Sequence, residues 1–247
     1  MSAAWDAPYA AVPAAYLGVW QRTLLEAPGR APDTTSTVFW LQTAHWHGDL
    51  RLPAQRPAFF GCRGVADCTP AQRRWLASQQ GFAGITEVSA VPGAGDDTTF
   101  CQWHRQVDFQ PARPHRDFGR MVFSNGGATV DEYGVDADYR ETWVRLPQST
   151  GASGAWRSEP DTAGPFGELL LVAGTCFFFL RDRRAPLPAV DDLQAVANRS
   201  DGALLLDMEL SFGHWNAAAG TGTILHSTLP WREGQELVRE MAWLVVR

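Results

Sequence analysis

Short runs of alternating aromatic and β-branched residues, broken at close intervals by glycine and proline, dominate this chain of 247 residues. The 23 glycines and 16 prolines are spread in small clusters along the whole sequence and do not gather in one linker. A period of two residues is typical of strands that bury one face, and frequent turn residues connect such strands into sandwiches or barrels. The sequence therefore predicts an all-β protein.

Only two segments carry a helical pattern. In residues 70–80, Thr69 can cap the helix, Pro70 suits its first position, and Gln72 completes a capping box. The second segment, about residues 189–198, collects its apolar side chains on one face of a helix. Each predicted helix follows a long predicted strand, residues 37–52 before the first helix and residues 168–183 before the second, and this parallel suggests an internal repeat.

The two halves of the chain align over short stretches. Residues 16–22 match residues 139–145 at Tyr, Trp and Arg with one constant spacing, and residues 49–53 match residues 179–183. Up-and-down closure of such units into barrels would remove exposed sheet edges. We place the boundary between the halves near residue 137. The predicted domains are two tandem antiparallel β-barrels with one short helix each, residues 1–137 and 138–247.

The triplet Gly18-Val19-Trp20 resembles the G-x-W signature on the first strand of lipocalin-type barrels. In that family the tryptophan closes the barrel floor and packs against an arginine, so the resemblance implies this role for Trp20 with Arg22 and for Trp143 with Arg145. The second half departs from the signature, because Glu141 stands at the glycine position. The whole chain is similar to uncharacterised proteins made of two fused lipocalin-like barrels, which implies an architecture but no activity.

The most polar predicted strand face lies within residues 45–52. Because side chains alternate along a strand, His45, His47, Asp49 and Arg51 are expected to share one face. Such a face can be solvated, or it can line a polar ligand cavity. It can also begin a metal site, since His-x-His on a strand needs only a further ligand from a neighbouring strand. The three interpretations stay open at this point.

Comparison with the second half favours an inward orientation of this face. The aligned residues there are Thr175, Phe177 and Phe179. Exposed aromatic side chains are unfavourable unless the other barrel or another subunit covers them. An inward orientation would give the first barrel a polar pocket and make the second barrel a packed scaffold.

Residues 101–109 form the expected neighbouring strand. His104 or Asp108 could complete a metal site or orient an imidazole for proton transfer. Arg105 lies on the other, apolar face and would need an anionic partner or ligand. The candidate catalytic residues are His45, His47, Asp49, His104 and Asp108. The candidate ligand-binding residues are Trp40, Trp46, Arg51, Trp103, Arg105 and Phe109.

Three functions fit this arrangement. The first is binding of a small, largely apolar or aromatic molecule in the N-terminal barrel, with aromatic walls and with arginines that take a polar or anionic end. The second is a lyase, isomerase or hydratase that uses histidine acid/base catalysis in the same cavity. The third is a protein-interaction module.

Charge and residue usage restrict the function classes further. All 21 basic residues are arginine, against 27 acidic residues, which gives a formal net charge of −6. Without lysine, Schiff-base and P-loop chemistry are excluded, and the acidic balance argues against nucleic acid as a partner. The sequence shows no signal peptide and no span for a membrane. We therefore expect a cytoplasmic protein with four reduced cysteines, no cofactor, a small-molecule ligand and a possible homodimeric state.

Overall fold

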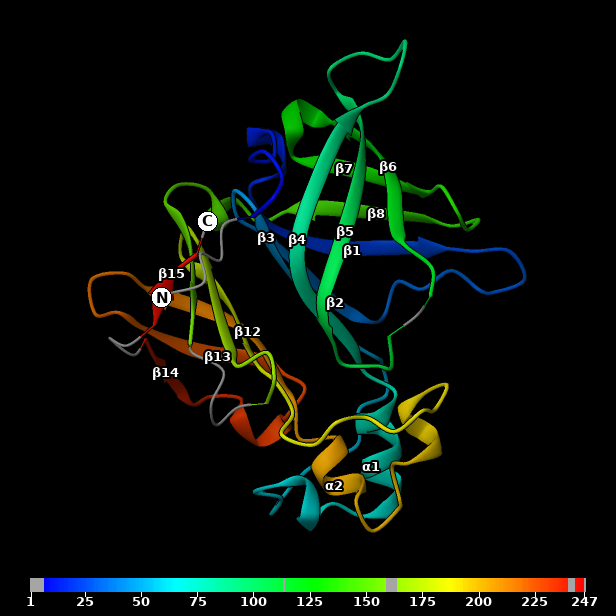
Figure 1. Ribbon diagram of the computed structural model, residues 1–247, viewed down its shortest axis with the longest axis vertical. Coiled ribbons are helices and arrows are strands. Elements are labelled where there is room, and N and C mark those ends of the chain that lie inside the picture. The colour runs from blue at the N-terminus through cyan, green and yellow to red at the C-terminus, as the bar shows by residue number, and fades with distance from the viewer. Residues whose placement is uncertain (1–6, 113, 159–163, 240–242, 247) are drawn as a thin grey trace.

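Eight strands close into an antiparallel barrel in their order along the chain, each paired with its neighbours and the last with the first (Figure 1). The computed structural model describes residues 7–112, 114–158, 164–239 and 243–246. The barrel strands are β1 (Gly18–Glu26), β2 (Thr37–Gln42), β3 (Trp46–Leu52), β4 (Gln80–Ala90), β5 (Thr98–Asp108), β6 (Asp117–Ser124), β7 (Thr129–Gly134) and β8 (Arg140–Arg145).

A second antiparallel sheet of seven strands follows and curls into a half-barrel that does not close. Its strands, in chain order, are β9 (Ser153–Arg157), β10 (Glu168–Ala173), β11 (Cys176–Arg181), β12 (Glu209–Asn216), β13 (Thr221–Ser227), β14 (Glu236–Val238) and β15 (Leu244–Val245). In space they are arranged in the order β14-β13-β12-β11-β10-β9-β15. The all-β prediction is confirmed. The second sheet stays open because its two edge strands have only three and two residues, too few to pair along a full barrel seam.

One of the two predicted helices is confirmed and the other is wrong. Helix α1 (Pro70–Ala77) begins at Thr69, whose hydroxyl accepts from the Gln72 backbone while the Gln72 side chain accepts from the Thr69 backbone. Residues 189–198 contain only a 3₁₀ turn, which Asp192 caps by accepting from the Ala195 backbone. The next backbone bonds, from Val196 to Leu193 and from Arg199 to Val196, span three residues and not the four of an α-helix. The short helix α2 (Gly202–Leu205) comes later in the chain.

Both long strands that the sequence predicted, residues 37–52 and 168–183, are hairpins. In the first, the Thr43 hydroxyl accepts from the Trp46 backbone and forms a turn that contains neither glycine nor proline. In the second, Gly174 takes a positive φ of 55° between β10 and β11. The first turn removes His45 from the strand on which it was expected.

Residues 139–145, which align with the first strand, complete the first barrel. Strand β8 pairs with β1, with Arg22 opposite Trp143 and Trp20 opposite Arg145. The last barrel strand thus lies beyond the boundary expected near residue 137. The order of three strands, a helix and a fourth strand occurs in both sheets, as β1–β4 with α1 and as β9–β12 with α2.

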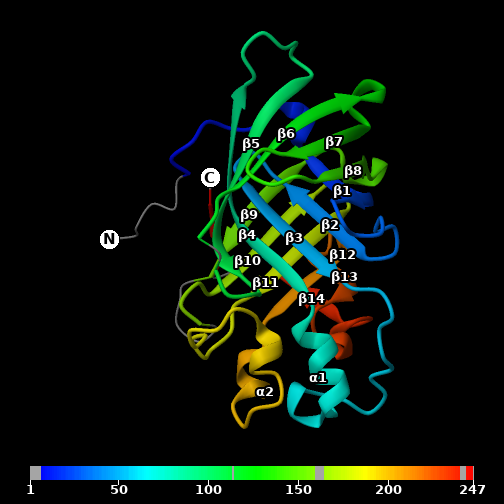
Figure 2. The same cartoon turned by 90° about the vertical axis from the view of Figure 1, so that its right-hand side faces the viewer.

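The two sheets share one apolar core. The outer face of β2, β3 and β4 packs against one face of β10, β11 and β12 (Figure 2). At the centre, Gly48 lies under the ring of Phe178, where an added Cβ atom would stand 2.3 Å from a ring carbon. Trp46 and Leu50, on the same face of β3 as Gly48, are buried in this core.

Aromatic side chains fill one end of the barrel lumen. The 3₁₀ turn Ala14–Tyr16 lies there, and the Trp20 indole donates to the Tyr16 carbonyl oxygen at 2.8 Å. The guanidinium of Arg145 lies 5.2 Å from the centre of the Trp20 ring. The expected pairing of Trp20 with Arg22 is therefore wrong: Arg145 of β8 lies against Trp20, and Arg22 donates to Asp33 and Glu141.

Candidate functional site

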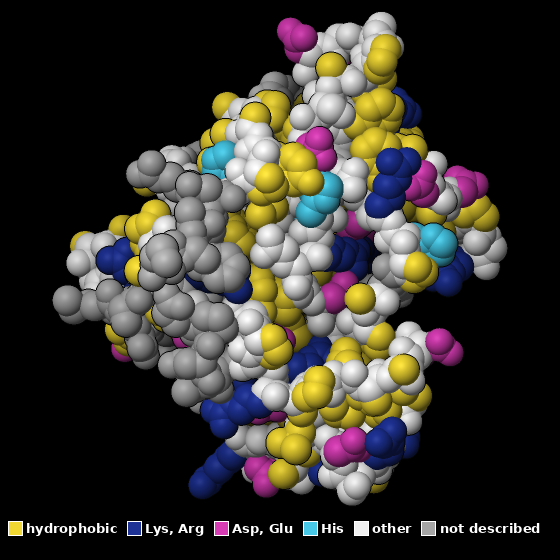
Figure 3. Space-filling view, viewed as in Figure 1, with side chains coloured by type: hydrophobic (Ala, Val, Ile, Leu, Met, Phe, Trp, Pro, Cys, Tyr) yellow, Lys and Arg dark blue, Asp and Glu magenta, His cyan; other side chains and the backbone are white. Residues whose placement is uncertain are grey.

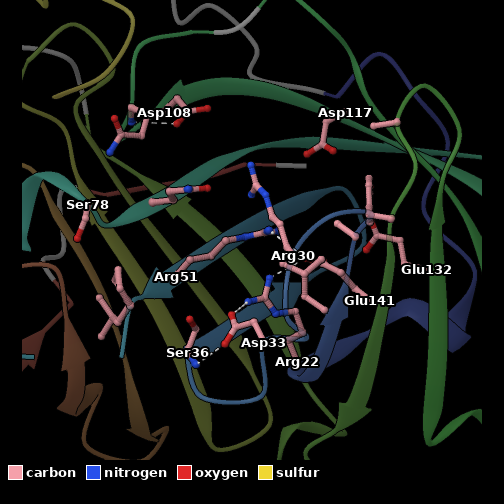
Figure 4. A pocket seen from close by; sticks show the side chains of 18 of the residues that line it. Arg22, Arg30, Asp33, Ser36, Arg51, Ser78, Asp108, Asp117, Glu132 and Glu141 are labelled. Atoms are coloured by element: carbon pink, nitrogen blue, oxygen red, sulfur yellow. Dashed lines mark hydrogen bonds and ion pairs between the residues drawn. The ribbon is translucent and has the colours of Figure 1, made fainter. Parts of the chain in front are cut away.

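The other end of the barrel opens into a charged pocket of about 550 Å³ (Figure 4). It is lined by residues at the ends of β1, β3, β5 and β7 and at the starts of β2, β4, β6 and β8, as the up-and-down topology requires. Basic and acidic side chains gather around a hollow on the face seen in Figure 3. The lining includes four arginines and six carboxyl residues, namely Arg22, Arg30, Arg51, Arg105, Asp33, Asp108, Asp117, Asp138, Glu132 and Glu141.

A chain of ion pairs crosses the pocket floor. Arg22 of β1 donates to Asp33 at 2.7 Å and to Glu141 at 2.6 Å. Arg51 of β3 donates to both oxygens of Asp49, at 2.8 and 3.1 Å, and to the same Oε1 of Glu141 at 3.3 Å. Asp49 is 2% exposed, and burial raises its pKa although Arg51 acts in the opposite direction. These arginines are therefore already occupied by carboxylates of the chain.

Glu132 lies directly opposite Glu141 on the neighbouring strand and, among the described residues, accepts no hydrogen bond from an arginine. It accepts from the Tyr139 hydroxyl at 2.7 Å and from the Trp143 indole at 3.1 Å. Burial raises the pKa of Glu132 to about 8, and the nearby Glu141 carboxylate adds to the rise. Gly119 leaves the room that this side chain occupies, since a Cβ there would lie 3.0 Å from Glu132 Cγ.

Arg105 lies at the rim of the pocket. Its guanidinium stacks on the ring of Phe82, 3.5 Å from the ring centre, and donates to Asp108 at 2.8 Å and to Asp117 at 2.7 Å. The anionic partner that the sequence required for Arg105 is thus supplied by the chain itself.

Four of the predicted site residues meet at this pocket. Arg51, Arg105 and Asp108 line it, and Asp49 holds Arg51 from behind. Asp108 reaches the lumen side because a β-bulge at Gln106 shifts the alternation of β5 by one residue. The same shift turns Val107 and Phe109 to the outer face, where both enter the core between the sheets.

The three predicted histidines lie apart from the charged pocket. His47 faces the lumen but is fully buried; the Thr86 hydroxyl donates to Gln42, so it accepts from His47 Nδ1 at 3.0 Å. Burial lowers the pKa of His47 well below its usual range, which keeps the imidazole neutral. His45 lies in the turn before β3. His104 lies on the outer face of β5, stacked on Tyr9 and bonded to Glu87 at 3.0 Å.

The predicted aromatic walls do not surround a free apolar cavity. Trp40 and Trp103 face the lumen and fill it together with Trp20 and Trp143. Trp46 and Phe109 lie outside the barrel in the core between the sheets. The space that remains in the barrel is the polar mouth.

Sequence reasoning missed most of the charged floor, namely Asp33, Asp117, Glu132, Tyr139 and Glu141. A usable signal was present on the short strands, since Glu141 lies two residues before Trp143 and Glu132 two residues after Val130. Residues two apart share a strand face, and both Trp143 and Val130 are buried in the lumen. A carboxylate in line with such a side chain is expected to face the lumen as well.

Within the described ranges, no group of three or more His, Cys, Asp or Glu side chains has an arrangement that could hold a metal ion. The His-x-His pair does not converge on one point, because His45 lies in a turn and His47 on a strand. No helix in the described part of the chain has both the length and the apolar character needed to cross a membrane.

Neither a protein-family model nor a curated protein matches the sequence. Among solved structures, the chain is similar to the crystal structure of the uncharacterized protein YLR301w from Saccharomyces cerevisiae. The TM-score is 0.50 at 14% sequence identity, and the match covers 85% of this chain and 84% of the yeast protein. At this identity the similarity concerns the fold alone and supports the β-barrel. The resemblance to lipocalins stays a prediction.

Proposed function

We propose that the protein binds a small polar molecule in the open mouth of its first barrel. The single observation that carries this proposal is a pocket of about 550 Å³ whose floor contains the buried ionisable residues Arg22, Glu132 and Glu141. Charged groups lose hydration when they are buried and are rarely kept in a pocket without a role. A polar ligand fits better than the largely apolar one expected from the sequence, because tryptophans already fill the apolar end of the lumen.

Histidine acid/base catalysis receives no comparable support. His45, His47 and His104 do not line the mouth; His104 lines an adjoining pocket that shares Arg105, Asp108 and Asp117 with it. The remaining features of the proposal are those expected from the sequence: a cytoplasmic protein in tandem lipocalin-like form, with a small-molecule partner and a possible homodimeric state.

A variant that fills the pocket tests this function. Ala137 lies exposed in the β7–β8 loop and lines the mouth, so Ala137→Trp should block the pocket without disturbing the core. We expect native mass spectrometry of protein purified from its own host to show a retained polar molecule in the wild type. The blocked variant should lose it.

A matched control separates blocking from a general effect of a new tryptophan. Ala94 is exposed in the β4–β5 loop at the opposite, filled end of the barrel. Ala94→Trp should retain the molecule at the wild-type level. Equal retention by wild type and Ala137→Trp would contradict the proposed function.

A further inference from the structure

The charges of the barrel mouth do not balance. Six carboxyl residues and four arginines line the pocket, and Asp49 adds a seventh carboxyl behind Arg51. Three of the four arginines, Arg22, Arg51 and Arg105, donate to carboxylates of the chain, and Arg30 is exposed at the edge of the pocket. Every guanidinium nitrogen of Arg51 and Arg105 donates to an aspartate or glutamate. The lining therefore offers a surplus of acceptors, and a ligand that supplies hydrogen-bond donors and positive charge complements it.

One acceptor on the floor has no partner. Glu141 is 3% exposed, and its Oε1 accepts from Arg22 and Arg51, while its Oε2 is buried with no hydrogen-bond partner among the described residues. An unmatched carboxylate oxygen at a buried position is unfavourable and is normally satisfied by a donor. Glu141 is one of the residues that line the pocket, so this unpartnered oxygen belongs to a side chain that a bound molecule would contact.

Glu132 lies directly opposite Glu141 on the neighbouring strand and accepts hydrogen bonds from two neutral donors, the Tyr139 hydroxyl and the Trp143 indole. If both were ionised, these two carboxylates would repel each other across the neighbouring strands unless a cation lay between them. We propose that the ligand of the barrel mouth carries an ammonium group, and that this group binds between the carboxylates of Glu132 and Glu141. This inference rests on the proposed function and adds the chemical class of the ligand.

Binding of the ammonium group is coupled to a proton. The groups around Glu132 are Glu141 of β8, Asp117 of β6, Arg51 of β3 and Tyr139 of the β7–β8 loop, with Tyr16 and Cys101 on the side of the filled lumen. Burial and Glu141 raise the pKa of Glu132 to about 8, so the empty pocket holds a proton there at pH 7. An ammonium ion favours the ionised carboxylate, and its binding therefore releases this proton.

Three probes of equal length and different end groups test the class of ligand. Calorimetric titrations of the full chain use n-butylamine, n-butanol and butanoate at pH 7. We expect the amine to bind and the alcohol and the carboxylate not to bind at the same millimolar concentrations. Titrations in two buffers of different ionisation enthalpy should show release of about one proton per amine bound. Affinity should rise between pH 6 and pH 8, where the amine remains charged.

Two conservative variants locate the binding group. Glu132→Gln and Glu141→Gln should each weaken amine binding about tenfold or more, because each removes a charge-assisted hydrogen bond. Glu132→Gln should also abolish proton release, an effect that a merely structural role would not produce. Glu87→Gln is the control, because Glu87 lies with His104 on the outer face of the barrel; it should bind as the wild type does.

The failures of the two proposals look different. Preferential binding of butanoate that Ala137→Trp abolishes would overturn the ammonium assignment and keep the polar pocket. Amine binding without proton release, or unchanged in both glutamine variants, would also overturn it. Absence of amine binding at millimolar concentration overturns the inference as well, while a host-derived molecule retained only by the open pocket would still support the proposed function.

Discussion

At the scale of single residues, the mouth of the barrel concentrates carboxyl groups that the fold holds out of water. Glu132 shows the effect of this burial: together with the nearby Glu141, it raises the pKa of Glu132 from an ordinary value of 4.5 to about 8. The sequence could not show this, because the shift depends on which strand lies opposite. It did show that Asp49 and Arg51 share a strand face, since alternation is a local property.

Stability should depend on the charge of Glu132. A carboxyl group whose pKa is higher in the folded state stabilises the fold at low pH, and this contribution is lost as pH rises through about 8. We expect the free energy of unfolding to fall between pH 5.5 and pH 8.5, by on the order of 2 kcal/mol from this group. Urea denaturation of Glu132→Gln should show a flatter profile. Parallel profiles for the two proteins would contradict the prediction.

The pair of Asp49 and Arg51 should be far more sensitive to loss of one member than of both. Arg51→Met leaves the buried Asp49 carboxylate without the arginine that now binds both of its oxygens, and we expect a loss of about 3–5 kcal/mol. Asp49→Asn combined with Arg51→Met should recover part of this loss. The unfolding free energies of the single and double variants measure the difference, and equal losses would refute the pairing.

At the scale of secondary structure elements, local signals decide what the sequence can predict. Helix α1 was predictable because its capping box lies within four neighbouring residues. The segment 189–198 also has a capping residue, Asp192, but only the 3₁₀ turn Leu193–Ala195 follows it. The bulge at Gln106 left no sequence signal, and it alone places Asp108 in the lumen and Phe109 outside it.

The cap of α1 offers a direct test of this local encoding. Thr69→Ala removes the hydroxyl that accepts from the Gln72 backbone and should lower the free energy of unfolding by about 1 kcal/mol. Thr69→Ser keeps an acceptor at the same position and should retain most of the stability. Chemical denaturation of the two variants checks this, and an equally large loss for the serine variant would argue against the cap.

The contact of β3 with β11 depends on the absence of one side chain. An alanine at Gly48 would place its Cβ 2.3 Å from a ring carbon of Phe178, so the ring or the strands must shift. We expect Gly48→Ala to cost about 1–3 kcal/mol, as overpacking of a core does. Addition of Phe178→Leu should relieve part of this cost. If the second change adds its full penalty instead, the contact does not limit the packing.

At the scale of the whole molecule, the barrel and the half-barrel are joined by a common core. The sequence predicted the all-β class and a barrel because strand alternation and turn spacing repeat along the chain. The sequence also predicted a second closed barrel, but this sheet stays open. Whether it closes depends on the length of the edge strands β14 and β15, which was not predictable.

Unfolding of the two sheets should therefore be cooperative. Leu50 of β3 is fully buried between them, and Leu50→Ala should destabilise the molecule by about 2–5 kcal/mol. Hydrogen exchange measures the free energy of opening at each protected amide. The Leu50→Ala change should lower this free energy by the same amount in β2 and β3 as in β10 and β12. Loss confined to the barrel strands would mean that the two sheets unfold independently.

In the described part of the chain, the turn Ala14–Tyr16 and the tryptophans of the lumen close one end of the barrel, and the pocket opens at the other end. A bound molecule must therefore dissociate through the same opening by which it entered. A bulky compound bound at the rim would therefore slow the dissociation of a ligand deeper in the pocket, even without direct contact between the two molecules. The residence time of a ligand can in this way depend on the rim, independently of its affinity for the floor of the pocket.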